Sequence, residues 1–468
     1  MDIPPLDGID ETQFKELTAQ ESNSIPGQRE KLRMIQRMIA LRLGKRREQV
    51  ESVLRLKGSG DRAAKDAATS QIQMCTPVTI TLPDGRSNLL MGKGGGSEAL
   101  YHIFVPAHID TVKVDAPYRE EGDRRMVNGG WDMTAAVLNN IALLTEITVP
   151  KILQVWFGFT VDEEANSLGA KAIMKDWENW KDVKLVVSSE IGPLVHPPAD
   201  DDLSPRIIAG RRGRAKFLST ITIDPEKQGH GAAEGLPNSH EAHVEWAWRM
   251  QQLFYRGIGL DGHPTQPVQM KHPLLGEEKI DFGTGNSIQL TPGYGHPFES
   301  VYRYYLQMVP PNTLAAALYE QQQTAARIAT LSEWTEKHGI RHRIVANTAE
   351  TAYEPFCMPM PEDPSHRHHP AIAITQEMLQ RVYGLAPVID GGGSVADENL
   401  YAADLLKRCE NGTFAGTNKG VLSIPIRGNN AHNLSEWVSW SDIAWVRHVM
   451  RLLLTDPRGY VRLAHARV

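Results

Sequence analysis

Short apolar segments alternate with amphipathic ones over much of the chain. Nearly continuous apolar runs at 99–110, 151–164 and 183–192 have the length of buried strands. The segments between them, 132–147 and 166–180, carry apolar residues at helical spacing. Strands that alternate with helices in this way predict an α/β domain, with a mostly parallel sheet covered by helices on both faces.

The middle of the chain follows a different pattern. Between about 210 and 347 the predicted elements run strand, helix, strand, strand, helix, strand, which is the order of the ferredoxin-like βαββαβ unit. The first pattern resumes afterwards, with a helix at 371–384 and an apolar strand at 420–428. We therefore expect a discontinuous α/β domain with a whole ferredoxin-like domain inserted into it.

These patterns divide the chain into four segments. Residues 71–209 and 348–468 form the two parts of the larger domain, and residues 210–347 form the inserted domain. Residues 1–70 are polar and charged, with helical spacing of Leu, Ile and Met in part of the segment. Two interpretations of this segment stay open: helices that pack on or lead into the larger domain, or a solvated arm.

Length, charge and cysteine content exclude several classes of protein. A chain of 468 residues exceeds what one hydrophobic core usually serves. Its formal net charge of -6 gives no basic surface for nucleic acid, and no stretch approaches the ~20 apolar residues that cross a membrane. The cysteines, Cys75, Cys357 and Cys409, are widely scattered, and the N-terminus lacks a signal-peptide pattern. We expect a cytoplasmic protein without nucleic-acid or membrane partners.

Polar side chains gather where the predicted strands end. His108 and Asp110 close the first apolar run, Glu163 and Glu164 close the second, and Glu190 closes the third. In open α/β sheets, ligands bind outside the carboxyl ends of the strands. We therefore expect these side chains to lie close together.

Two further residues extend this set. Asp132 stands at the start of a predicted helix, and His432 lies far downstream in a polar loop. Two imidazoles and several carboxylates suit one or two divalent transition metals, with zinc as the leading candidate. Each residue alone has an ordinary explanation, such as Asp132 capping its helix. Their joint occurrence at strand ends and helix starts favours a metal site.

Five short motifs together resemble the M20 metallopeptidase family, which includes aminoacylases, carboxypeptidases and deacylases such as succinyl-diaminopimelate desuccinylase. The resemblance covers most of residues 95–440, including the inserted domain. The motifs are "HIDTV" (108–112), "GGWDM" (129–133), "TVDEEANSLGA" (160–170), "SSEIGP" (188–193) and "NNAHNLSE" (429–436). Any one of them is weak evidence, but their order makes the set specific.

The resemblance implies a ligand set for two metals. His108 and Glu190 would bind one metal, and Glu164 and His432 would bind the other. Asp132 would bridge the two. The metals would be zinc, with manganese or cobalt as alternatives. The larger domain would then be the catalytic domain, and the inserted domain would be its lid.

The resemblance also implies roles for residues that bind no metal. Asp110 would orient the imidazole of His108, as metal-bound histidines commonly require. Glu163 would be the general base and would later donate the proton to the leaving amine. In the lid, His230 would donate to the developing oxyanion, and Asn286 would lie near the substrate.

One departure from the family concerns substrate recognition. The lid of the family usually carries an arginine before a proline that holds the substrate carboxylate. The corresponding segment, 304–311, reads "YYLQMVPP" and has no arginine. Trp131, before the second-motif aspartate, is also unusual. We therefore expect atypical substrate recognition beside a complete metal site.

These observations favour an M20-like metallohydrolase that cleaves the C–N bond of an amide or peptide-like small substrate. Metal-activated water would attack the carbonyl, with a glutamate as the general base. One alternative is an aminohydrolase, or deaminase, of an aromatic or amidine-type amine that could work with one metal. Another is a non-catalytic binding protein of the same fold. The apolar helix around 246–254 predicts a homodimer or higher homo-oligomer formed through the lid.

Overall fold

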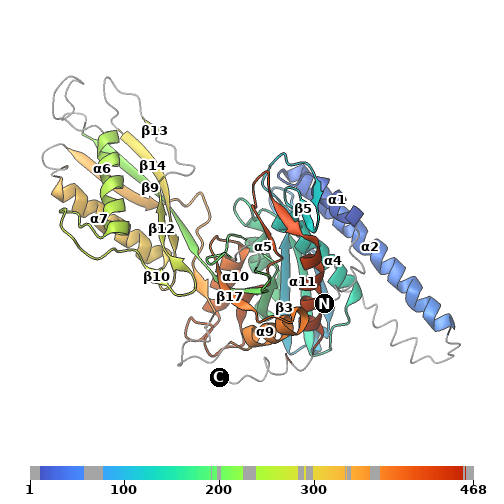
Figure 1. Cartoon of the computed structure of the whole chain (residues 1–468). Helices are drawn as coiled ribbons and strands as arrows, with labels where there is room; N and C mark the ends of the chain where they lie inside the picture. The colour runs from blue at the N-terminus through green and yellow to red at the C-terminus, as the bar shows by residue number, and fades with distance from the viewer. Residues whose placement is uncertain are drawn as a thin grey trace. The chain divides into compact units, whose positions relative to one another are not determined.

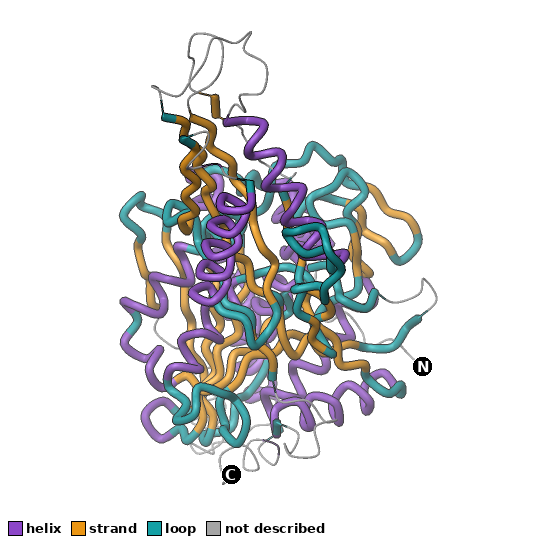
Figure 2. The backbone as a smooth tube through the Cα atoms, turned by 90° about the vertical axis from the view of Figure 1, so that its left-hand side faces the viewer, coloured by secondary structure: helices purple, strands orange, loops and turns teal. Residues whose placement is uncertain are grey.

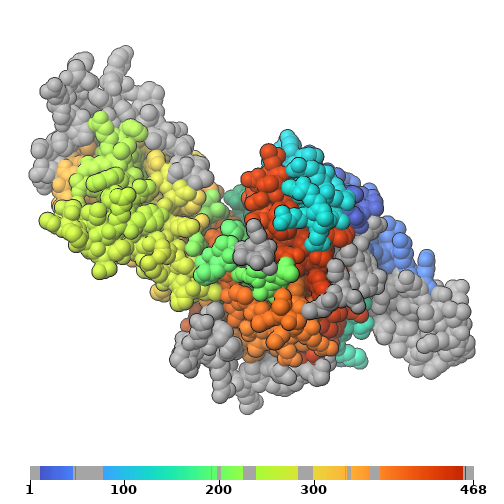
Figure 3. All heavy atoms as spheres, in the orientation of Figure 1, coloured from blue at the N-terminus to red at the C-terminus, as the bar shows by residue number. Residues whose placement is uncertain are grey.

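The computed structural model divides into two compact units, each described here by itself. The first comprises Met1–Gly210 and Cys357–Val468, and the second comprises Arg211–Phe356. In Figure 3 the first unit carries both the blue-to-green start and the orange-to-red end of the chain. The structure describes residues 11–56, 77–190, 192–197, 202–224, 239–282, 289–290, 299–332, 334, 339–358, 369–456 and 459. His230 and Asn286 lie outside the described residues.

A nine-stranded sheet forms the centre of the first unit, in the order β1-β2-β6-β3-β7-β18-β8-β16, with β17 beside β8. The pairs β6–β3, β3–β7 and β7–β18 are parallel, whereas β1–β2, β2–β6 and β18–β8 are antiparallel. The strands are β1 (Val78–Thr81), β2 (Ser87–Gly94), β3 (Tyr101–His108), β6 (Leu153–Thr160), β7 (Val183–Ser188), β8 (Arg206–Arg211), β16 (Phe356–Cys357), β17 (Val388–Gly392) and β18 (Gly420–Ser423). The predicted α/β class with a mostly parallel sheet is confirmed.

Helices cover both faces of this sheet (Figures 1 and 2). On one side α2, α4, α9 and α11 pack together, and on the other α5 packs with α10. Leu32 and Ile35 of α2 enter the main hydrophobic core, so this part of the N-terminal helix packs on the unit. The helices are α2 (Ile25–Leu56), α4 (Ala135–Glu146), α5 (Leu168–Asp176), α9 (Pro370–Tyr383), α10 (Asp397–Lys407) and α11 (Trp440–Thr455).

Strand β3 shows why the apolar runs are continuous. Ile103 and Val105 belong to the main core. Phe104 points to the opposite face, where its ring centroid lies 5.8 Å from that of Trp177 and 5.5 Å from that of Tyr401. Successive side chains of a strand alternate between the two faces of the sheet. In a strand that is covered on both faces every position is therefore buried, which favours a continuous apolar run.

Smaller elements complete the first unit. A four-stranded antiparallel sheet has the order β19-β20-β5-β4. No helix among the described residues is long and apolar enough to span a bilayer. The remaining elements are α1 (Glu11–Ala19), η1 (Gly96–Glu98), β4 (Arg119–Glu121), β5 (Arg124–Met126), η2 (Gly130–Thr134), η3 (Glu178–Asp182), β19 (Gly428–Asn429) and β20 (Trp437–Ser439).

The second unit has the ferredoxin-like arrangement. Its main sheet has the order β12-β14-β9-β15, with β13 also paired to β14, and these pairs are antiparallel. Both α6 and α7 pack on this sheet. The small hairpin β10–β11 was not predicted. The elements are β9 (Gly213–Ile223), α6 (Ser239–Gln251), η5 (Gln252–Arg256), β10 (Lys271–His272), β11 (Gly276–Glu277), β12 (Lys279–Asp281), β13 (Gln289–Leu290), β14 (Glu299–Met308), α7 (Leu314–Leu331) and β15 (Ile340–Ala346).

Most of the apolar side chains of the helix that we expected to drive self-association are buried inside this unit. Trp246, Met250 and Phe254 belong to its core and are at most 3% exposed. Trp248, in contrast, is 59% exposed. Self-association through this unit therefore stays a prediction.

Two histidines of the second unit, the buried His243 and the half-buried His342, share one serine hydroxyl. The Oγ atom of Ser219 lies 2.9 Å from His243 Nε2 and 2.7 Å from His342 Nε2. Burial lowers the pKa of His243 to about 4 and that of His342 to about 3. Both imidazoles are therefore neutral in the folded protein at neutral pH.

We expect this pair to make the protein sensitive to acid. In the unfolded chain a histidine has a pKa of about 6.5. Above that pH neither the folded nor the unfolded state binds the proton, so the free energy of unfolding keeps its full value. This stability is lost as the pH falls from about 6.5 towards the folded pKa values, by up to about 1.4 kcal/mol per histidine for each pH unit. Thermal unfolding of the full chain between pH 7 and 4 measures this loss. His342→Phe keeps a ring against Trp246 and should show a shallower decline, whereas an unchanged decline would contradict the prediction.

Candidate metal centre

Neighbouring parallel strands bring the predicted ligands to one edge of the sheet. His108 is the last residue of β3 and pairs with Thr160, the last residue of β6. Glu163 and Glu164 come shortly after the end of β6, and Glu190 comes shortly after the end of β7. Because β6, β3 and β7 are adjacent and parallel, their carboxyl ends meet at the same edge.

Two clusters of side chains share the carboxylate of Asp132. In one cluster His108 Nε2 lies 3.0 Å from Asp132 Oδ1 and 3.7 Å from Glu190 Oε2. In the other His432 Nε2 lies 3.2 Å from Asp132 Oδ2 and 3.0 Å from Glu164 Oε2. Within each cluster the potential ligand atoms lie within 4.8 Å of one another.

These separations fit a pair of divalent ions. Ligand atoms about 2.0–2.1 Å from a tetrahedral metal lie roughly 3.3–3.4 Å apart. The distances from the two imidazoles to Asp132, 3.0 and 3.2 Å, are near this value. The two oxygens of Asp132 face different imidazoles, as a bridging carboxylate requires. The structure therefore brings together all five residues expected to bind metal.

The charge balance of the cluster also suits a cation. Burial opposes a charge on His108, but the hydrogen bond to Asp132 and the charge of Glu190 outweigh it and raise its pKa well above the usual value. Hydrogen bonds to Asp132 and Glu164 raise the pKa of His432 to about 10. The surrounding carboxylates thus favour the protonated form of both imidazoles. A divalent cation would supply the same compensation and release those protons.

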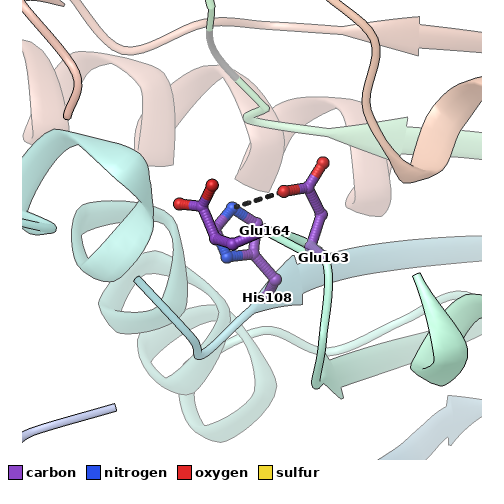
Figure 4. Close-up of side chains that lie close together, drawn as sticks. All are labelled: His108, Glu163 and Glu164. Carbon is purple, nitrogen blue, oxygen red and sulfur yellow. Dashed lines mark ion pairs between the residues drawn. The ribbon is translucent and has the colours of Figure 1, made fainter. Parts of the chain in front are cut away.

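Glu163 stands beside the two clusters. Its Oε2 atom is 4.0 Å from His108 Nε2, farther than Asp132 or Glu190, and its side chain is 12% exposed. Figure 4 shows its carboxylate diverging from that of Glu164 near the His108 ring. Burial, followed by the charges of Glu190 and Glu164, raises the pKa of Glu163 well above the usual value. A carboxyl group that holds a proton readily suits an acid–base role.

Asp110 lies next to His108, but through a different atom from the one expected. His108 Nδ1 is 2.9 Å from the carbonyl oxygen of Asp110 and 3.7 Å from its carboxylate Oδ1. The other carboxylate oxygen accepts the backbone N–H of Glu164 at 3.1 Å. An Nδ1–H that donates to the carbonyl leaves Nε2 free to bind metal. The Asp110 side chain instead fixes the loop of the two glutamates.

Sequence reasoning gave no role to Glu436, which is 1% exposed. Its carboxylate accepts the backbone N–H groups of Gly129 and Trp131, both at 3.0 Å, and of Asp132 at 3.1 Å. Glu436 thereby ties the loop of His432 to the loop of Asp132. The available signal was its place in the fifth motif and the glycine-rich segment at 129–130, whose N–H groups need an acceptor.

Replacing Glu436 with glutamine should lower metal affinity by roughly 10–100-fold, as is typical when a group that supports a ligand is lost. Glutamine has one acceptor oxygen, so the three N–H groups can no longer share a carboxylate. Competition for zinc with a chromophoric chelator measures the change. Glu120→Gln, on an exposed strand, is the control and should bind zinc like the wild type. Unchanged affinity in Glu436→Gln would contradict the prediction.

Several solved structures of known proteins share the fold of this chain. The chain is similar to an aminopeptidase, PepT, of Bacillus cereus, with a TM-score of 0.60, 11% identity and 95% and 96% of the two chains covered. It is similar to human carnosine dipeptidase 1, with a TM-score of 0.59, 14% identity and 97% and 95% coverage. It is also similar to a dinuclear metal-binding peptidase of the M20 family from Bacillus subtilis, with a TM-score of 0.54, 11% identity and 95% and 99% coverage.

These identities establish a shared fold alone. The comparison with curated protein sequences gave no match. The model of peptidase family M20/M25/M40, in contrast, matches residues 104–456, which include all five motifs. The chain therefore belongs to peptidase family M20/M25/M40 and is a hydrolase that acts on C–N bonds.

Proposed function

We propose that this protein hydrolyses the amide or peptide-like bond of a small substrate, with two divalent metals and Glu163 as the general base. The observation that carries the proposal is the placement of Asp132 between two imidazoles, each with a further carboxylate beside it. His108 and Glu190 would hold one ion, and the other pair of ligands would hold the second. The imidazole and carboxylate ligands suit zinc, with manganese and cobalt as alternatives.

Each step assigned to the chain uses a residue of the centre. Two bound divalent ions would supply the Lewis acidity that activates water and polarises the substrate carbonyl. Glu163 takes the proton of the attacking water. Its carboxylate lies beside the proposed ligands but farther from His108 than Asp132 or Glu190, so it is available to accept a proton. The same carboxyl group then donates that proton to the leaving amine. Burial of His108 and Asp132 keeps bulk water from weakening these interactions.

The names of the similar structures support a small peptide-like substrate. One of them is a dipeptidase and another an aminopeptidase. An aminohydrolase of aromatic amines would need exposed aromatic side chains, for which Trp131, Tyr304 and Tyr305 are the candidates, but each of them has another partner here. The Tyr305 hydroxyl donates to Asp281 Oδ2 at 2.8 Å. Trp131 donates from Nε1 to the Ile426 carbonyl at 2.7 Å, and the Tyr304 hydroxyl, in the core of the second unit, lies 3.0 Å from Gln321 Oε1. Trp131 and Tyr304 are also buried, so neither supports recognition of an aromatic amine.

Metal analysis combined with a substrate screen tests the proposal. Protein purified without added metal should contain roughly two equivalents of divalent metal by mass spectrometry. Dipeptides, N-acyl amino acids and aromatic amines should then be screened for turnover. Release of an amine and a carboxylate supports the proposal, whereas ammonia release with one metal indicates an aminohydrolase. Protein with neither metal nor turnover would indicate a binding protein.

A further inference from the structure

Arg86 is a buried arginine that the proposed chemistry does not use. It precedes β2 in the β1–β2 hairpin and is 7% exposed. Its Nη1 atom lies 2.5 Å from Asp162 Oδ1 and 3.4 Å from Gln28 Oε1. Its Nε and Nη2 atoms donate to Asp84 Oδ2 at 2.9 and 2.6 Å. A buried guanidinium is unfavourable without such partners, so the hairpin is built to hold this charge against Asp162.

Asp162 stands at the start of the loop that carries Glu163 and Glu164, the two glutamates of the metal centre. Its φ angle of 69° lies in the left-handed region, which is uncommon for a residue other than glycine. Its carbonyl oxygen accepts the N–H groups of Asn166 at 3.2 Å and Ser167 at 2.6 Å. Its Oδ2 atom accepts the N–H of Leu168 at 3.2 Å. An unfavourable backbone conformation persists only when its surroundings hold it, and here several contacts do so.

The arginine completes this set of contacts from outside the loop. The contacts within residues 162–168 come from the loop itself and could move with it. Arg86 belongs to a separate hairpin, and Gln28 belongs to α2, so they tie the loop to the body of the unit. The direction in which Glu163 and Glu164 leave β6 depends on the backbone of Asp162, because they follow it immediately.

We propose that Arg86 is a positioning residue that acts through Asp162 to hold Glu163 and Glu164 at the metal centre. The inference rests on the proposed function, since it assumes that Glu164 binds metal and Glu163 is the base. It predicts an asymmetric effect. The cluster of Glu164 and His432 depends on the loop, whereas the cluster of His108 and Glu190 is supported by β3 and β7.

Stepwise zinc binding to the full chain tests this asymmetry. In Arg86→Met one zinc should bind roughly 10–100-fold more weakly, while the other binds as in the wild type. Arg86→Lys keeps a charge and should recover part of the affinity. Asp162→Asn keeps a residue that tolerates the left-handed conformation but removes the charge, and it should weaken the same site. It also serves if Arg86→Met does not fold.

A matched control separates positioning from general stability. Arg42 also ties α2 to the body, through Glu146 at 3.4 Å and Gln13 at 3.0 Å, but lies away from the glutamate loop. Arg42→Met should bind both zinc ions normally. Equal weakening of both sites in Arg86→Met, or no weakening, would overturn the inference while leaving the proposed function intact. Wild-type protein that binds no zinc would overturn both.

Discussion

Replacing Glu163 with glutamine should lower kcat by roughly 10²–10⁴-fold, the range associated with general acid–base catalysis, while bound metal stays unchanged. Glutamine keeps the shape of the side chain but cannot accept the proton of water. Glu163 Oε2 is 4.0 Å from His108 Nε2, whereas Asp132 Oδ1 is at 3.0 Å, so no close ligand is lost. Metal content by mass spectrometry and steady-state kinetics on a hydrolysed dipeptide measure the two effects separately.

The adjacent glutamate supplies the matched control. Glu164 is as buried as Glu163, with side-chain exposures of 11% and 12%, but it contacts His432 at 3.0 Å. Glu164→Gln should therefore lose metal as well as turnover. If Glu163→Gln loses metal and Glu164→Gln keeps it, the two glutamates have exchanged roles. The geometry of the loop, in which consecutive side chains diverge, makes the two outcomes easy to distinguish.

The apolar pattern predicted the strands that matter for the site, but not their order. The run at 99–110 becomes β3, which is covered on both faces, and its last residue is His108. The placement of β18 (Gly420–Ser423) beside β7 (Val183–Ser188) joins distant parts of the chain. Such pairing depends on tertiary packing, which leaves no local periodicity. The two-residue strands β10 and β11 are also too short to show a pattern.

The residues proposed as ligands could be selected from the sequence because their own side chains stand at the ends of predicted strands or at the start of a predicted helix. The groups that support them were less accessible. Glu436 accepts N–H groups of the backbone, and backbone groups are present at every position of a sequence. The acceptor of the His108 Nδ1–H group, the carbonyl oxygen of Asp110, is also a backbone group, so the sequence carries no signal for it. Arg86 is separated from Asp162 along the chain, and only the packing of the hairpin against the loop reveals the pair.

Replacing Asp132 with alanine should empty both metal sites and abolish turnover. Its Oδ1 atom faces His108 and its Oδ2 atom faces His432, so one substitution removes a ligand from each ion. It also removes the negative charge between two divalent cations, whose mutual repulsion then acts across a buried site. Because ligands that bind only the folded state stabilise it, added zinc should no longer raise the Tm.

His108→Ala is the informative comparison for Asp132→Ala. It removes a ligand from one cluster only, so one zinc should remain, held by Glu164, His432 and the bridging carboxylate. Metal content and the zinc-dependent change in Tm should therefore rank Asp132→Ala below His108→Ala, and His108→Ala below the wild type. If Asp132→Ala retains two metals and wild-type kcat, the carboxylate does not bridge. The centre would then have to be two independent sites, which the contacts of 3.0 and 3.2 Å to a single carboxylate argue against.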